Sequence, residues 1–226
     1  YYYAWGVHVD KNDKIYVPNH YRHQVQILNT SLVPQSKIGG SQTRMDVAHE
    51  VIKKIVSNTD LTSGANFGLQ QWSTTRANDT RIIVPISDTG ASKIYTAVNN
   101  VSAIGYTTDL RHAITQARNY FRSGQVPNYN KSCARNYLIV ISDGYWTNHS
   151  SVLGIADQLN KNENVQTFVV GLALSGPNSN YATLAQKGGT KTPLYATNAA
   201  DLLNKLTDAI KQAISGRLTF TTPAIM

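Results

Sequence analysis

The sequence predicts an α/β protein, with a doubly wound and mostly parallel sheet and helices on both faces. From Arg44 onward, apolar stripes at helical spacing alternate with short apolar runs, and this alternation is typical of the strand-helix-strand units that build parallel sheets. One run, residues 137–141, is apolar at nearly every position, as in a central strand buried on both faces. A chain of 226 residues with 41% hydrophobic composition can bury one such core.

Residues 1–43 do not follow the alternation, and we predict that they form a separate aromatic-rich segment or an insertion. Two short apolar stretches around Lys11-Asn12-Asp13 indicate a hairpin, and polar sequence with Pro34 and Gly39-Gly40 follows. We expect the main domain to span residues 44–216 and residues 217–226 to be an exit linker.

The main domain is predicted to begin with a helix, because Thr43 is a common N-cap type and precedes an apolar stripe. Pro85 indicates that the strand over 81–86 lies at an edge of the sheet or that the strand ends there, since proline cannot donate to a central ladder. The remaining elements follow in order: strands over 67–72 and 81–86, a short helix through Ile94 and Val98, a longer helix opened by Thr107-Thr108-Asp109, the strand that ends at Asp143, a helix through 152–159, a strand over 165–172, a short helix over 181–186, a short strand over 193–196 and a last helix through 202–210.

The most informative residue is Asp143, which follows the buried strand directly and precedes Gly144. In open α/β sheets the ligand crevice lies outside the carboxyl ends of the strands, so a carboxylate there is a candidate ligand. An Asp that only caps a turn or the next helix also fits Ser-Asp-Gly. Mg²⁺ prefers one or two carboxylates supplemented by hydroxyls and waters, and the Thr107/Thr108 pair stands in a corresponding loop.

In element order, about residues 44–214 resemble a von Willebrand factor type A domain. In that family a metal-ion-dependent adhesion site joins an Asp-x-Ser-x-Ser loop after the first strand, a Thr before a long helix and an Asp after the fourth strand. Here Thr108-Asp109-Leu110 is similar to the threonine motif and Ile141-Ser142-Asp143-Gly144 to the fourth-strand motif. The resemblance implies Thr108 and Asp143 as ligands of Mg²⁺ or another divalent cation.

The first motif of that family has no full counterpart in the chain. If residues 24–33 contain it, Asn29 and Ser31 stand at two ligand positions and Val33 at the third. Gln24 and Gln26 alternate with apolar residues there, which suits a half-exposed strand and not a sheet centre. Alternatively, the first strand and its motif precede Tyr1, and residues 1–43 are an insertion that follows them.

Within the family, the chain is most similar to tip-associated adhesins of type IV pili of the PilC/PilY kind. The aromatic start Tyr1-Tyr2-Tyr3-Ala4-Trp5 and the tail from Ser215 carry this likeness. It implies an extracellular adhesion module at a bacterial pilus tip, with a host-cell or surface receptor and minor pilins as partners. The alternative is a metal-independent structural or mechanosensing module that joins pilus subunits, through its surface or through Cys133.

Composition argues against several other classes. The formal charge of +8 favours anionic partners, but the basic residues are scattered, so we expect no nucleic-acid groove. No apolar run reaches membrane-spanning length. A single cysteine excludes an internal disulfide or a cysteine-rich zinc site. No Ser/His/Asp or Cys/His grouping is apparent, so we expect no enzyme.

Overall fold

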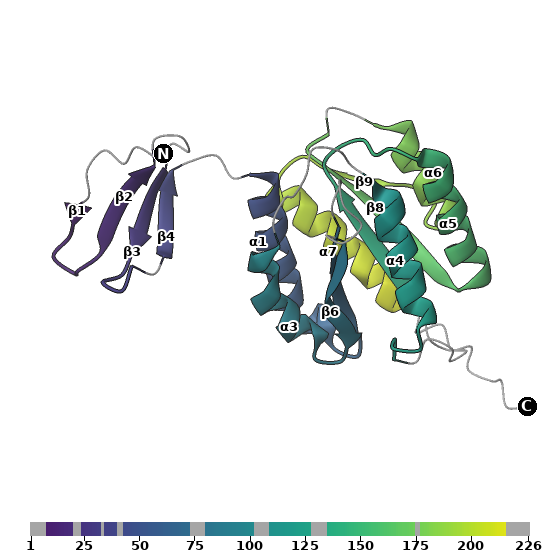
Figure 1. The fold of residues 1–226 in the computed structure, drawn as a ribbon, viewed down its shortest axis with the longest axis horizontal. Coiled ribbons are helices and arrows are strands. Elements are labelled where there is room, and N and C mark those ends of the chain that lie inside the picture. Colours follow the sequence, from purple (N-terminus) through teal and green to yellow (C-terminus); the bar gives the residue numbers. More distant parts are fainter. Residues whose placement is uncertain are drawn as a thin grey trace, which may run out of the picture. The chain divides into compact units, whose positions relative to one another are not determined.

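The computed structural model describes residues 8–19, 24–32, 34–39, 43–72, 80–101, 109–127, 135–174 and 177–215 (Figure 1). The chain divides into two compact units, Tyr1–Thr43 and Arg44–Met226. The predicted exit linker, residues 217–226, lies outside the described residues.

The first unit is a four-stranded antiparallel sheet in the order β1-β2-β3-β4. Its strands are β1 (His8–Val9), β2 (Ile15–Asn19), β3 (Gln24–Leu28) and β4 (Pro34–Gly39). The β1–β2 pair confirms the predicted hairpin. No strand was predicted in the polar sequence after Pro34, but these residues pair with β3 as β4. A proline is accommodated as the first residue of a strand, where its missing N–H leaves the ladder intact.

The second unit alternates helices and strands as the sequence predicts. Its strands are β5 (Phe67–Gln71), β6 (Arg81–Ser87), β7 (Asn136–Ser142), β8 (Val165–Leu172) and β9 (Leu194–Ala196). Its helices are α1 (Arg44–Val56), α2 (Thr59–Thr62), α3 (Gly90–Ala97) with a 3-10 turn (Val98–Asn100), α4 (Leu110–Arg122), α5 (His149–Asn162), α6 (Ser179–Lys187) and α7 (Ala199–Ser215).

The strands of this unit form two hydrogen-bonded ladders. β7, β8 and β9 are parallel, with β8 in the middle. β5 and β6 are antiparallel, and among the described strands β6 pairs with β5 alone, which agrees with the edge position that Pro85 predicts. A parallel sheet with helices on both faces is therefore confirmed, with an antiparallel pair as its second ladder.

Side chains of successive strand residues point to opposite helical layers. On one face Val140, Val165 and Val169 pack with residues of α4, α5 and α6. On the other face Val170 and Leu172 pack with α1 and α7. Figure 1 shows α4, α5 and α6 on one side of the strands and α1 and α7 on the other. The predicted α4 stripe is confirmed, since Leu110, Ala113, Ile114, Ala117 and Phe121 are all buried.

Candidate functional site

Strand β7, of which Val140 and Ser142 are buried and the other residues half-buried, places Asp143 at the carboxyl edge of the parallel ladder. β7 ends at Ser142, and β7, β8 and β9 run in the same direction, so the loops that follow them open on one edge. The Asp143 side chain is 58% exposed. It is therefore available to a ligand at the edge where open α/β sheets bind their ligands.

Arg44, the first residue of α1, reaches this carboxylate from another part of the chain. Its Nη1 lies 3.3 Å from Asp143 Oδ2 and donates a 3.1 Å hydrogen bond to the Asp143 carbonyl oxygen. The Arg44 side chain is 53% exposed, and exposed ion pairs contribute only about 0–1 kcal/mol. The pair thus adds little to stability, but it sets a positive charge beside the acidic group.

The start of α4 joins the same edge through Asp109. Asp109 caps the helix by accepting a 3.0 Å hydrogen bond from the Arg111 backbone N–H. Its other oxygen accepts a 3.3 Å hydrogen bond from the Asn148 side-chain amide, in the loop after β7. The N-cap of α4 and the loop that follows β7 are therefore in contact. Thr107 and Thr108 themselves lie outside the described residues.

Buried aromatic side chains hold the loop after β7 in place. The Tyr181 hydroxyl donates a 2.7 Å hydrogen bond to the Gly144 carbonyl, and the Trp146 and Tyr181 rings lie 4.6 Å apart. Burial raises the pKa of Tyr181 above its ordinary value, so the phenol stays a hydrogen-bond donor. Tyr145, in contrast, is 72% exposed. The loop is thus anchored on its inner side and presents Tyr145 outward beside Asp143.

Sequence reasoning missed Arg44, Asn148 and Tyr145 as members of this edge. The signal for Asp109 was available, because it directly precedes the apolar stripe of α4 and Asp is a preferred N-cap. No local sequence signal pointed to Arg44, because its contact with Asp143 spans 99 residues of sequence.

The donors among the described residues do not by themselves fit a divalent cation. Two described carboxylates lie at this edge, and both already have partners. Asp143 has Arg44 as its counter-charge, and Asp109 is bonded to Asn148 and lies 3.6 Å from both Arg111 and His112. Among the residues that the structure describes, no group of three or more His, Cys, Asp or Glu side chains is placed to hold a metal. Hard cations require several oxygen ligands, so a metal here depends on donors such as Thr108.

Asn29 and Ser31 lie in the first unit, in the turn between β3 and β4. The Asn29 side chain accepts a 3.1 Å hydrogen bond from the Ser31 backbone N–H, which is an Asx turn. β3 belongs to the antiparallel sheet and not to the parallel ladder of Asp143, so the reading in which it supplies the first strand of the parallel sheet is corrected. Their role as metal ligands stays a prediction.

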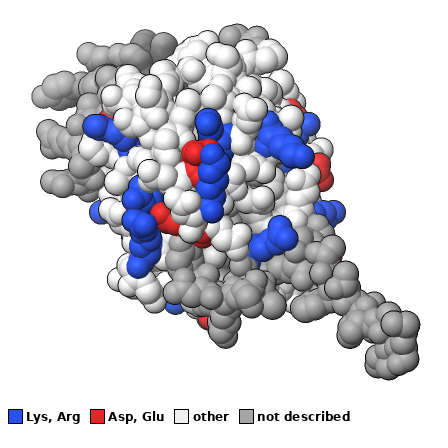
Figure 2. Space-filling view, turned by 90° about the vertical axis from the view of Figure 1, so that its right-hand side faces the viewer, with Lys and Arg blue, Asp and Glu red and all other residues white. Residues whose placement is uncertain are grey.

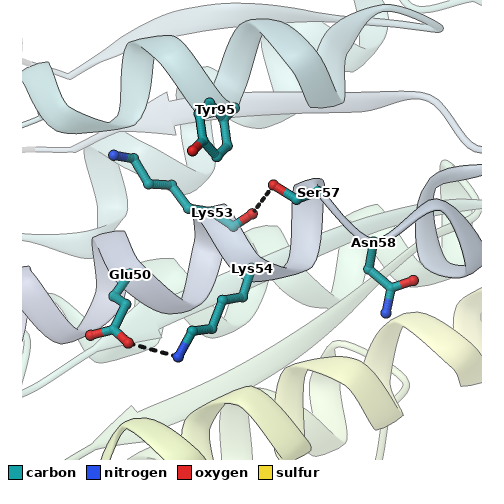
Figure 3. A pocket seen from close by; sticks show the side chains of 6 residues that line it. All are labelled: Glu50, Lys53, Lys54, Ser57, Asn58 and Tyr95. Atoms are coloured by element: carbon teal, nitrogen blue, oxygen red, sulfur yellow. Dashed lines mark hydrogen bonds and ion pairs between the residues drawn. The ribbon is translucent and has the colours of Figure 1, made fainter.

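Contacts within the chain account for the charged groups of one surface hollow. A hollow of about 420 Å³ on α1 and α3 is lined by Glu50, Lys53, Lys54 and Tyr95 among others (Figure 3). There Lys54 is paired with Glu50 at 2.7 Å and Lys53 lies over the Tyr95 ring. On the face of α4, α5 and α6, Figure 2 shows basic side chains as separate groups, several beside acidic ones, and no continuous basic band.

No helix among the described residues has the length and apolar character needed to cross a bilayer.

Comparison with known proteins identifies the domain. The family model of the von Willebrand factor type A domain matches residues 36–212. A comparison with curated protein sequences gave no significant match.

Two similar solved structures share the fold. Proximal thread matrix protein 1 from the mussel byssus has a TM-score of 0.56 and 17% identity, and the match covers 76% of this chain and 42% of that one. The manganese-loaded TRAP protein of Plasmodium vivax has a TM-score of 0.54 and 15% identity, with 74% and 65% covered. The chain thus spans less than two thirds of either protein. The family match covers more than half of the 226 residues, and the chain therefore belongs to the von Willebrand factor type A domain family.

Proposed function

We propose that this domain is a non-enzymatic adhesion module that binds a protein or surface ligand through the carboxyl edge of the β7-β8-β9 ladder. Domains of this family generally mediate adhesion and protein binding. The observation that carries the proposal is the exposed Asp143 carboxylate at the end of β7, beside Arg44 and the exposed Tyr145. A charged pair and an aromatic ring on an anchored loop supply polar specificity and contact area together.

We further propose that the module belongs to a tip protein of a bacterial type IV pilus and faces the outside of the cell. Its partners would be a host-cell or surface receptor and the minor pilins. The aromatic-rich start of the chain and the tail after Ser215 support this placement. The separate β1–β4 sheet ahead of Arg44 is consistent with an added contact surface.

An adhesion assay tests the edge directly. Beads coated with the protein are applied to epithelial monolayers and to bare glass, and retained beads are counted after washing. Asp143→Asn should reduce retention at least about tenfold, because a buried charge contact in an interface contributes more than about 1.4 kcal/mol. Asp60→Asn, which removes an exposed charge in α2, is the matched control. Equal retention of the two variants would contradict the proposal.

The metal-dependent form of this function adds a divalent cation held by Thr108 and Asp143. The manganese-loaded TRAP protein, which has a similar fold, supports metal binding. The Arg44 guanidinium argues against it, because it already balances the Asp143 charge. Calorimetry with Mg²⁺, Mn²⁺ and Ca²⁺ decides between them. Under the metal-dependent form the protein gives heat that Asp143→Ala abolishes and that Arg44→Gln increases, because removal of the guanidinium frees the carboxylate. No heat from any of these proteins would refute metal binding.

The second candidate is a metal-independent module that joins pilus subunits or senses force. The Arg44–Asp143 pair favours it, because the carboxylate then has its positive partner within the chain. Bead retention that is unchanged by EDTA but lost in Asp143→Asn is the expected result for a metal-independent contact. If the subunits are linked by a disulfide through Cys133, non-reducing gels of assembled pili should show a disulfide-linked species that Cys133→Ser removes.

A further inference from the structure

A second hollow lies at the end of the parallel ladder that is opposite to Asp143. Its volume is about 240 Å³. Arg135, which precedes β7, and Tyr137, the second residue of β7, line it together with Gln166 of β8. The extended chain from Tyr137 to Asp143 is about 20 Å long. The hollow is therefore separate from the candidate site at the carboxyl edge.

Two aromatic rings supply the apolar part of this hollow. Tyr137 is in register with Gln166, and Phe168 lies two residues further along β8, so the three side chains point to the same face of the ladder. Val170 continues this alternation and packs with residues of α7. The rings of Tyr137 and Phe168 lie 5.9 Å apart at an interplanar angle of 33°. Phe168 is 7% exposed, so its ring is held firmly by the core.

The loop from α6 to β9 forms one wall of the hollow and is fixed by hydrogen bonds. The Thr190 hydroxyl donates a 2.7 Å hydrogen bond to the Thr167 carbonyl. The backbone N–H groups of Thr190 and Lys191 both donate to the Ala185 carbonyl, at 3.0 and 3.1 Å. They hold Lys191 at a φ of 70°, which is uncommon for a residue other than glycine. Such backbone persists where its surroundings over-determine it, and it clusters at ligand sites.

The hollow carries two positive charges that no described carboxylate balances. Arg135 and Lys191 line it, and no described Asp or Glu does. Neither cation forms an ion pair with a carboxylate among the described residues. In the hollow on α1 and α3, in contrast, Lys54 is paired with Glu50. The hollow at the amino end of the ladder is therefore suited to an anion.

The remaining polar groups suit the hydroxyls of a sugar. Gln166 and Gln212, the latter in the last turn of α7, bring side-chain amides, which can both donate and accept hydrogen bonds. A sugar ring has an apolar face that packs on aromatic rings and an edge of hydroxyls that pairs with amides. The volume is below the range of about 300–1,000 Å³ that is typical for drug-sized ligands. It therefore suits a single sugar residue.

We propose that this hollow binds a carboxylate-bearing sugar, a uronic or a sialic acid residue of a glycan. The ring lies against Tyr137 and Phe168, and the carboxylate lies between Arg135 and Lys191, which bind it through charge-assisted hydrogen bonds. A neutral sugar lacks the charge and a simple anion lacks the ring, so both bind more weakly. The inference goes beyond the proposed adhesion function and does not depend on Asp143.

An NMR titration of the ¹⁵N-labelled protein tests the proposal. The probes are the methyl glycosides of glucuronic acid and of N-acetylneuraminic acid, which distinguish the two classes of acidic sugar. At least one of them should cause saturable shifts of the backbone amides of Gln166, Gly189 and Lys191. Amides of the β2–β3 pair, which lies in the other unit, are the reference and should not shift.

Two further probes separate the carboxylate from the ring. Methyl glucoside has the ring of the glucuronide without its carboxylate, and sodium acetate has a carboxylate without a ring. Both should bind at least about tenfold more weakly than the acidic sugar, because each lacks one of the two contacts. Equal affinity for methyl glucoside, or equal affinity for acetate, overturns the proposal.

Matched charge variants separate the hollow from the general positive charge of the protein. Arg135→Gln and Lys191→Gln should each raise the dissociation constant of the acidic sugar at least about fivefold, because each removes a charged donor. Tyr137→Leu, which removes a ring face, should weaken the acidic sugar by a similar factor and leave acetate unchanged. Lys211→Gln removes an exposed cation of α7 that does not line the hollow, and it should change the constant less than about twofold.

The outcomes are distinct from those of the adhesion assay. Asp143→Asn should bind the acidic sugar as the parent protein does, so a failure at the carboxyl edge leaves this result unaffected. The absence of shifts with both acidic sugars overturns the proposal. Equal weakening by Lys211→Gln and Lys191→Gln would show non-specific attraction and also overturns it.

Discussion

The two units of the chain are stabilised in different ways. The Arg44–Met226 unit buries a large set of apolar side chains in three clusters on the faces of its strands. In the described part of the Tyr1–Thr43 unit, the buried hydrophobic residue is Ile27. Its strands are held by ladder hydrogen bonds and by turns in which a side chain, Asp10 or Asn29, accepts from backbone N–H groups. Burial therefore dominates the stability of the second unit, whereas the contacts seen in the described part of the first unit are mainly ladder and turn hydrogen bonds.

The largest expected effect is a cavity in the second unit. Leu159 of α5 is 0% exposed and packs among α4, α5, α6 and the parallel strands, so Leu159→Ala should reduce the free energy of unfolding by about 2–5 kcal/mol. Urea denaturation measures it, followed by the fluorescence of Trp146 in a background in which Trp5→Phe and Trp72→Phe remove the other two tryptophans. Ile27→Ala is the matched variant in the first unit, and a similar shift of the Trp146 transition in that variant would show that the two units unfold as one.

An intermediate effect is expected at Glu163, the acidic residue that ends α5. Its side chain is 6% exposed and lies 3.3 Å from Arg118 Nε and 3.2 Å from Arg122 Nε. Glu163→Gln keeps the shape of the side chain but removes its charge. It should lower the free energy of unfolding by about 1–3 kcal/mol. The exposed pair Glu50–Lys54 at 2.7 Å gives the control, because Glu50→Gln should cost about 0.5 kcal/mol or less. Equal losses of unfolding free energy in the two variants would show that the burial of Glu163 is not the cause of the effect.

A smaller effect is expected where the core supports the candidate site. Tyr181→Phe removes the hydrogen bond to the Gly144 carbonyl and should cost about 0.5–1.5 kcal/mol. Because burial raises the pKa of Tyr181 above 10.0, its contribution is present below pH 10 and is lost as the pH rises through the raised value. Thermal denaturation between pH 8 and pH 11 should therefore show a steeper alkaline loss in the parent than in Tyr181→Phe. Tyr145→Phe, at an exposed ring, should behave like the parent.

The smallest effect is a pH response confined to the first unit. The backbone N–H of Lys14 donates to the Asp10 carboxylate and lowers its pKa below 3.8. The carboxylate therefore supports the β1–β2 turn above pH 4, and this support is lost as the pH falls through the lowered pKa. Amide chemical shifts of Asn12 and Lys14 should move between pH 5 and pH 2, and this movement should vanish in Asp10→Asn. Amides of β8 serve as the reference, and their movement over the same range with the same midpoint would show that the response is not specific to the β1–β2 turn.

The second unit was predictable from sequence because its signals are local and repeated. The apolar residues of α4 recur at helical spacing, and those of β7 form a continuous run. The alternation of such helices and strands is compatible with few topologies. In the first unit, β4 was missed because its residues are polar and begin with Pro34, so pairing with β3 and not composition makes it a strand. At the candidate site Asp143 was predictable from the end of β7, whereas Asn148 and Arg44 entered only through contacts across the sheet edge.

The sequence by itself determined the α/β class, the order of the longer helices and the strands of the second unit, and the position of Asp143 at the end of an apolar strand, because periodicity and strand ends are properties of neighbouring residues. Only the tertiary structure decided that Arg44 is the counter-charge of Asp143, that Asp109 joins the loop after β7 and that β5 and β7 lack a described partner on one edge. These features depend on residues far apart in the chain, and the packing of helices on both faces of the sheet brings them together.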